Sequence, residues 1–154
     1  MKHYIGFDTS SFAIHAAIID EEEKLVELLK WDCNKKAKFE ERFPELITNF
    51  NNDVQSLKGY KASLENAIPV RNSRAYTITA RVVGAVWALL ATADIRTEFV
   101  HQATWKKVCL GNGQAKKDDI MKYAIEKWGD KFPEQDYADA VCIALWNKRR
   151  LVEC

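Results

Sequence analysis

The feature that most constrains the fold is the order in which strand-like and helix-like patterns follow one another along the chain. Three strand-like segments come first, at residues 3–8, 12–19 and 25–32, and short turns join them. After a helical pattern we expect a fourth strand at 60–65, then a long helix and a fifth strand at 95–100. The order βββαβαβα, with extra helix near the end, predicts an α/β fold with a five-stranded mixed sheet flanked by helices.

The predicted helices follow the spacing of apolar residues. Between residue 35 and about residue 57, apolar side chains recur every three or four positions, and Pro44 is placed where it would kink or split the helix. Ser73 is the expected N-cap of the long helix that runs from residue 74 to about residue 93. A short helix is expected at 104–110. The Gly111-Asn112-Gly113 loop follows it, and further helices are expected at 117–128 and from about Pro133 onward.

Length and composition predict a single domain, residues 1–154, with a sizeable core. The longest apolar stretch, at 82–93, is shorter than the roughly 20 residues that a membrane span requires, so we expect a buried helix there. The start of the chain lacks the pattern of a secretory signal, and the four cysteines lie far apart without a Cys-x-x-Cys pair. We therefore expect a cytoplasmic protein with reduced thiols and no membrane partner.

Four carboxylates stand where predicted elements begin or end. Asp8 closes the first apolar strand, and Glu65 closes the fourth. Asp136 and Asp139 open the final helix, and their spacing of three places them on one helix face. Because ligand sites in such sheets favour the carboxyl ends of strands, we expect Asp8 and Glu65 to meet in space.

Converging carboxylates predict a site for hard divalent cations such as Mg²⁺, which prefer oxygen ligands. Two such ions about 3.5–4 Å apart promote hydrolysis of a phosphodiester bond. Without a cation the acids would repel one another and raise one another's pKa.

Each acid taken alone also has an ordinary structural interpretation. Asp136 and Asp139 suit the first turn of a helix, where a cap and negative charge are favourable. Asp8 suits a tight turn with Ser10, and Glu65 suits an exposed strand end. The joint occurrence of all four in this order of elements favours the metal site.

Four motifs carry a family resemblance: Gly6-Phe7-Asp8-Thr9-Ser10, Leu64-Glu65-Asn66, Gly111-Asn112-Gly113-Gln114-Ala115-Lys116-Lys117 and Asp136-Tyr137-Ala138-Asp139-Ala140. With these motifs in order, the chain resembles the RuvC-type Holliday junction resolvases over most of residues 3–147. The resemblance implies a ribonuclease H-like fold, a homodimer, and symmetric nicks across a four-way DNA junction. It also implies that Asp8, Glu65, Asp136 and Asp139 hold two Mg²⁺ ions per active site, with Mn²⁺ expected to substitute.

The resemblance gives roles to basic residues that charge alone does not assign, since the net charge is only +1. Lys106 and Lys117 match positions where the family keeps lysines beside the active site, and we expect both to assist catalysis. An ordinary solvated first turn is the alternative for residues 116–119. DNA contacts are expected from Arg71, Asn72, Arg74, Lys106, Lys107, Lys116, Lys117 and Ile68.

Two departures from the family pattern and one charge run carry separate expectations. Ser10 replaces a usual glycine, which changes the shape of the first turn. Ile68 stands where bacterial members have an aromatic residue that stacks on junction bases; an isoleucine can wedge but not stack, so we expect weaker sequence preference. Three glutamates at 21–23 predict a solvated hairpin turn.

The expected function is a Mg²⁺-dependent, structure-selective endodeoxyribonuclease that resolves Holliday junctions, and by extension other branched DNA, through symmetric phosphodiester hydrolysis. A branched-DNA-binding protein of the same fold that does not cut is the alternative. An ATPase of the actin or sugar-kinase type is disfavoured because those folds need two domains, and ribonuclease H and transposase-type nucleases fit the Asp-x-x-Asp helix opening less well. Small residues spaced along the long helix would permit contact with a second subunit, or with a neighbouring helix of the same chain: Ala80, Gly84, Ala88 and Ala91.

Overall fold

The computed structural model of the protein describes residues 1–69 and 71–150, so Cys154 lies outside the described part. Five strands form one sheet in the order β3-β2-β1-β4-β5. β1 pairs antiparallel with β2 and β2 with β3, whereas β1, β4 and β5 run parallel. The predicted mixed sheet is confirmed. The strands are β1 (His3–Thr9), β2 (Ala13–Asp20), β3 (Leu25–Asp32), β4 (Lys61–Glu65) and β5 (Thr97–Val100).

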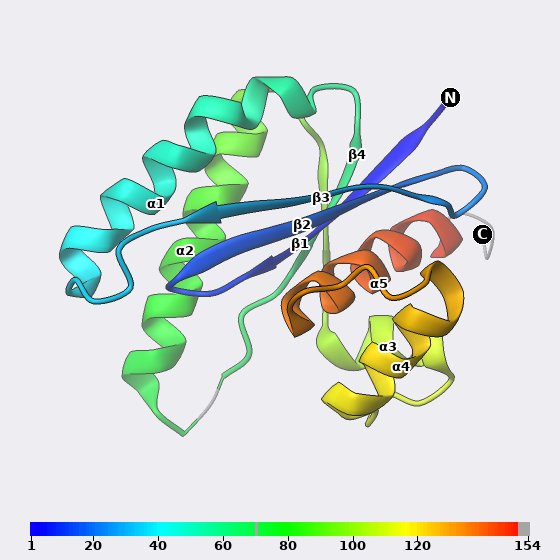
Figure 1. Cartoon of the computed structure of the whole chain (residues 1–154). Helices are drawn as coiled ribbons and strands as arrows, with labels where there is room; N and C mark the ends of the chain where they lie inside the picture. The colour runs from blue at the N-terminus through cyan, green and yellow to red at the C-terminus, as the bar shows by residue number, and fades with distance from the viewer. Residues whose placement is uncertain (70, 151–154) are drawn as a thin grey trace.

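Helices cover both faces of the sheet (Figure 1). α1 and α2 lie on one face, and α5, with α3 and α4 outside it, lies on the other. Each side has its own apolar core, the first around Phe7, Phe50 and Leu90 and the second around Trp105 and Ile143. The helices are α1 (Phe39–Asp53), continued by the 3₁₀ turn η1 (Val54–Leu57), α2 (Ser73–Thr92), α3 (Gln102–Leu110), α4 (Lys117–Trp128) and α5 (Gln135–Arg150).

Alternation along the strands decides which side chains reach α5. In β1, Ile5 and Phe7 enter the core under α1 and α2, so the residues between and after them face the opposite side. In β4, Leu64 enters the same core, whereas the buried Ser63 hydroxyl donates to the Ile143 carbonyl of α5 over 3.1 Å. Asp8 and Glu65 therefore leave the sheet on the α5 side.

Gly6 permits α5 to lie directly on β1. A Cβ atom at this position would collide with the backbone of Ala140 and Ala144. Because glycine lacks that atom, the helix backbone approaches the strand more closely than any other residue would allow. This contact sets the distance between Asp8 at the end of β1 and the acids in the first turn of α5.

Several boundaries differ from the sequence-based expectations. Asn72, not Ser73, is the N-cap of α2, and its side-chain oxygen accepts from the amides of Arg74 and Ala75. Pro44 lies inside α1 without splitting it. The proline removes a single backbone hydrogen-bond donor near the start of the helix, and the remaining helical hydrogen bonds continue past it. The fifth strand begins at Thr97 instead of residue 95.

The expectation that residues 82–93 form a buried helix was wrong in part. Val82, Val83, Val86 and Leu90 are buried, whereas Trp87 on the other side of α2 is 50% exposed. Among the helices in the described part of the chain, α2 alone has the length and apolar composition of a membrane span. The apolar stretch is longer than expected because it extends back to Ser73 with only two charged residues.

In the β2–β3 hairpin turn Glu21 and Glu22 are exposed as expected, whereas Glu23 is only partly exposed and differs from the expectation. Its carboxylate forms ion pairs with Lys127, Lys148 and Arg149 from α4 and α5, at 2.7–3.2 Å, and its side chain is only 16% exposed. The Trp128 indole N–H donates to the Glu23 carbonyl. The sequence could not indicate this cluster because the cations lie more than 100 residues away. We call Glu23 and its three cations the Glu23 cluster.

Candidate metal centre

Three of the four predicted acids converge. Asp8 lies at the end of β1, and Asp136 and Asp139 lie in the first turns of α5, the helix that packs on β1. Carboxylate oxygens of these three residues lie within 4.8 Å of one another. Folding therefore brings residues from opposite ends of the chain into one acidic group.

Glu65 lies beside the group formed by Asp8, Asp136 and Asp139 but is not one of its three members. It lines the same cavity as Asp8 and is close enough to raise the pKa of Asp8 through charge repulsion. One of its carboxylate oxygens, Oε2, accepts a hydrogen bond from the indole N–H of Trp105 in α3. Trp105 is fully buried, so this bond fixes where Glu65 points. No local sequence pattern indicates this role of Trp105.

The pKa values of Asp8, Glu65 and Asp139 are raised. Burial, followed by the charges of Asp139, Glu65 and Asp136, holds the pKa of Asp8 well above its usual range. Burial raises the pKa of Glu65 to about 7, against the Trp105 hydrogen bond, and raises that of Asp139 to about 6, against a hydrogen bond from Gln135. The folded protein therefore concentrates negative charge that water does not fully solvate.

This group of acids fits a hard divalent cation. Within the described residues, no lysine or arginine forms an ion pair with Asp8, Glu65 or Asp139. Their oxygens supply the ligand type that Mg²⁺ and Mn²⁺ prefer, and the imidazole of His15 lies at the edge of the group, next to Asp136. A divalent cation would relieve the repulsion that raises these pKa values.

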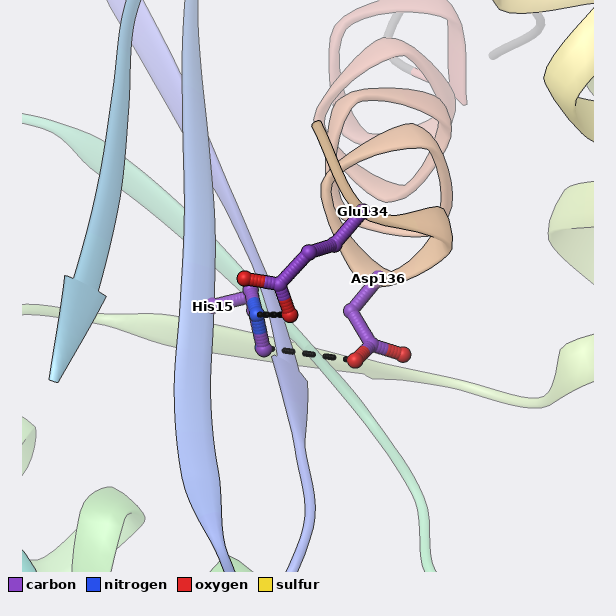
Figure 2. Close-up of side chains that lie close together, drawn as sticks. All are labelled: His15, Glu134 and Asp136. Carbon is purple, nitrogen blue, oxygen red and sulfur yellow. Dashed lines mark hydrogen bonds and ion pairs between the residues drawn. The ribbon is translucent and has the colours of Figure 1, made fainter. Parts of the chain in front are cut away.

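His15 of β2 was missed by the sequence-based prediction. It is the cross-strand partner of Asp8, and Figure 2 shows its ring between the side chains of Glu134 and Asp136 at the start of α5. Its Nε2 lies 3.2 Å from Glu134 and its Nδ1 lies 3.7 Å from Asp136. A histidine within an otherwise apolar strand was the available signal.

The two lysines predicted to assist catalysis lie near the acids. The charges of Lys106 and Lys117 both act to lower the pKa of Asp139, and Lys106 acts in the same way on Glu65. Lys106 is half-buried and Lys117 is exposed at the start of α4. Both positions suit contact with a phosphate that approaches the acids.

The other predicted DNA contacts are exposed. Asn72 uses its side-chain oxygen to cap α2, and Lys116 occupies the N-cap position of α4, where its backbone amide donates to Asp119. This arrangement matches the alternative interpretation of residues 116–119 as an ordinary first turn of a helix. Exposed side chains remain at Arg71, Asn72, Arg74, Lys107, Lys116 and Ile68.

A cavity of about 320 Å³ extends from the acids toward α2. Asp8 and Glu65 lie on one wall, and Tyr76 and Thr79 of α2 lie on another, with Ile68 also at the cavity. Tyr76 is 37% exposed and Ile68 is 43% exposed. An aromatic side chain from the first turn of α2 thus lies at the same cavity as Glu65.

Comparisons with known proteins find similarity to crossover junction endodeoxyribonucleases. The family model described as "Crossover junction endodeoxyribonuclease RuvC" matches residues 4–147. The crossover junction endodeoxyribonuclease RuvC of Brachyspira hyodysenteriae (strain ATCC 49526 / WA1) is 26% identical over 116 residues, which cover 75% of this chain and 72% of that protein.

Solved structures show the same ribonuclease H-like fold. Thermus thermophilus RuvC superimposes with a TM-score of 0.78 at 15% identity, covering 97% of this chain and 96% of that one. The structure of T. thermophilus RuvC in complex with a Holliday junction substrate gives a TM-score of 0.79 at 16% identity, covering 95% and 92%.

Proposed function

Because the chain belongs to the RuvC family of crossover junction endodeoxyribonucleases, we propose that it resolves four-way DNA junctions in a Mg²⁺-dependent, structure-selective reaction. The observation that carries the proposal is the convergence of Asp8, Asp136 and Asp139, with Glu65 in the adjoining cavity. The reaction is hydrolysis of one phosphodiester bond in each of two symmetric strands. Other branched DNA is included in the proposed range of substrates.

We propose that Asp8, Glu65, Asp136 and Asp139 hold two Mg²⁺ ions, for which Mn²⁺ can substitute. Such ions, when bound, lower the pKa of an attacking water and neutralise charge on the leaving oxygen. The protein contributes fixed positions for their ligands. Close packing of α5 on Gly6 sets the separation of Asp8 from the helix, and Trp105 holds one oxygen of Glu65 so that the other is free to face the cation.

Lys106 and Lys117 are proposed to hold the phosphate beside the acids. Their charges already act on Asp139 in the folded protein, so they lie within electrostatic reach of a phosphate at the same place. Exposed basic side chains farther out, at Arg71, Arg74, Lys107 and Lys116, are proposed to contact the DNA backbone, together with the Asn72 amide.

The cavity next to the acids is proposed to receive a base near the branch point. Tyr76 offers a flat aromatic face there, and Ile68 offers an apolar edge. Stacking of a base on an aromatic side chain contributes about 1–3 kcal/mol and tolerates any sequence. This agrees with the expectation of weak sequence preference.

A homodimer is proposed because two equivalent sites would then face two equivalent strands of a junction. The exposed side of α2 supports this proposal: Gly84, Ala88 and Ala91 are exposed there, and the space beside Gly84 is open. Residues 1–154 are proposed to act as one nuclease domain in the cytoplasm, without contact with a membrane.

The decisive experiment uses a labelled four-way junction, a linear duplex of the same sequence and an RNA–DNA hybrid, each with Mg²⁺ and with chelator. We expect paired nicks in the junction with Mg²⁺, binding without nicks in chelator, and little cutting of the other two substrates. Binding without nicks in both conditions would support the non-cleaving alternative. Preferential cutting of the hybrid would instead indicate a ribonuclease H activity.

A further inference from the structure

His15 occupies a position in the sheet where packing alone does not require a histidine. It lies in β2, opposite Asp8 of β1, and its side chain is only 3% exposed. Its neighbours on the same face of β2, Ala17 and Ile19, belong to the apolar core under α5. An apolar residue would fill this position without burying polar nitrogens.

Both nitrogens of the His15 ring face carboxylates at the start of α5 (Figure 2). Nε2 lies 3.2 Å from Glu134 Oε2, and Nδ1 lies 3.7 Å from Asp136 Oδ2. The ring also packs edge-to-face against Tyr137, with 4.8 Å between centroids. His15 therefore touches three of the four residues from 134 to 137.

Lys30 extends this contact to a third element. Its ammonium group lies 2.6 Å from Glu134 Oε1 and 3.6 Å from Asp32. Lys30 on β3 and His15 on β2 thus hold the two oxygens of Glu134 from neighbouring strands. The start of α5 is fixed against the sheet by charged contacts as well as by packing.

Contacts that restrict the rotamer matter more for Asp136 than for the other acids, because its side chain is the more exposed one. It is 48% exposed, so solvent would otherwise allow it several rotamers. Asp136 belongs both to the group with Asp8 and Asp139 and to the group with His15 and Glu134. The side chain of Asp136 is therefore held by a hydrogen bond with Asp8 and by the contact with His15.

We propose that His15, held by Glu134 and Lys30, is a positioning residue that keeps Asp136 in the orientation that ligates the cation. The inference rests on the proposed function, because it takes Asp136 as a ligand. Partners that orient a ligand typically change metal affinity 10–100-fold when they are removed. His15 would act on the cation through Asp136 and not by contact with it.

The test measures Mn²⁺ binding to the free protein by titration calorimetry and compares wild type with His15→Leu, His15→Gln and Glu134→Gln. We expect His15→Leu to weaken binding of the cation about 10–100-fold without changing the number of ions bound. His15→Gln, which keeps a side-chain donor toward Glu134, should recover part of the loss, and Glu134→Gln should show a smaller loss. His3→Leu is the matched control, because His3 lies on the same sheet at the end of β1 away from Asp8 and packs on Tyr60.

A second measurement needs no metal. Amide hydrogen exchange over residues 135–138 should be faster in His15→Leu than in wild type, whereas exchange in the rest of α5 and the melting temperature should change little. Wild-type Mn²⁺ affinity in His15→Leu would overturn the proposal, and loss of one whole bound ion would overturn it by making His15 a ligand. If the wild type itself binds no Mn²⁺, the proposed metal centre fails, which is a separate result.

Discussion

The two ends of α5 hold carboxylates in opposite electrostatic surroundings. At its start, Asp136 and Asp139 join Asp8, and the nearby charges are mostly negative. At its far end, the carboxylate of Glu23 is surrounded by Lys127, Lys148 and Arg149. The negative charge of Asp8, Asp136 and Asp139 is thus available to a bound cation, whereas that of Glu23 is neutralised by side chains of the protein.

The pKa values record this difference. Hydrogen bonds from Arg149, then from Lys127 and Lys148, lower the pKa of Glu23 to about 2. Burial raises the pKa of Glu65 to about 7 and that of Asp139 to about 6. Burial raises the pKa values of Glu65 and Asp139, whereas the three cations around Glu23 outweigh the effect of burial there.

The largest expected effect comes from Asp8→Asn, which removes a proposed ligand without changing its shape. Junction cleavage should fall by at least about 10³-fold, because several kcal/mol of charge stabilisation is lost in the transition state. Junction binding in chelator should persist, and the metal-free protein should be no less stable, since a repelled charge is gone. Cleavage assays with Glu23→Gln as the matched control measure the contrast, and intact cutting by Asp8→Asn would remove Asp8 from the site.

Addition of Mg²⁺ should stabilise the protein, and more so at pH 8 than at pH 5.5. The pKa values of Glu65 and Asp139 are raised in the folded protein. Without metal, the contribution of these two protonated groups to the free energy of unfolding is therefore fully present below about pH 4 and is lost as pH rises through 6–7. Mg²⁺ at about 100 times its Kd would restore roughly 2.7 kcal/mol. Thermal melting at the two pH values checks this, and an equal shift at both would contradict it.

Glu23→Gln should lower the free energy of unfolding by about 1–3 kcal/mol, because three cations lose a charged acceptor. The sign of its pH dependence is opposite to that of the metal centre. The lowered pKa of Glu23 gives stability that is present above about pH 4.5 and is lost as pH falls toward 2. Urea unfolding of both proteins between pH 2 and 7 should show the curves converging at low pH.

Lys106→Ala should have the smallest effect. Lys106 lies near Glu65 and Asp139 but forms no ion pair with either in the described structure, unlike the cations around Glu23. Junction affinity should fall several-fold and the slope of its dependence on salt should decrease by about one, as expected for one lost phosphate contact. An unchanged slope would exclude Lys106 from direct contact with DNA.

The sequence by itself determined the sheet, the order of elements and the positions of the four acids. These follow from local patterns: the continuous apolar run Tyr4–Phe7, the helical spacing after residue 35, and the separation of three between Asp136 and Asp139. Such patterns do not fix the first residue of a helix, and the N-cap of α2 is Asn72 where Ser73 was expected.

Only the tertiary structure decided which acids are neutralised and which are not. Glu23 appeared to be a solvated turn residue, yet it meets cations more than 100 residues away, whereas Asp8 meets two further acids, Asp136 and Asp139, at a similar sequence distance. His15, Trp105 and Tyr76 joined the site by contacts between elements that no local pattern specifies. Charge compensation depends on neighbours in space and on exclusion of water, and both exist only after the helices have packed on the sheet.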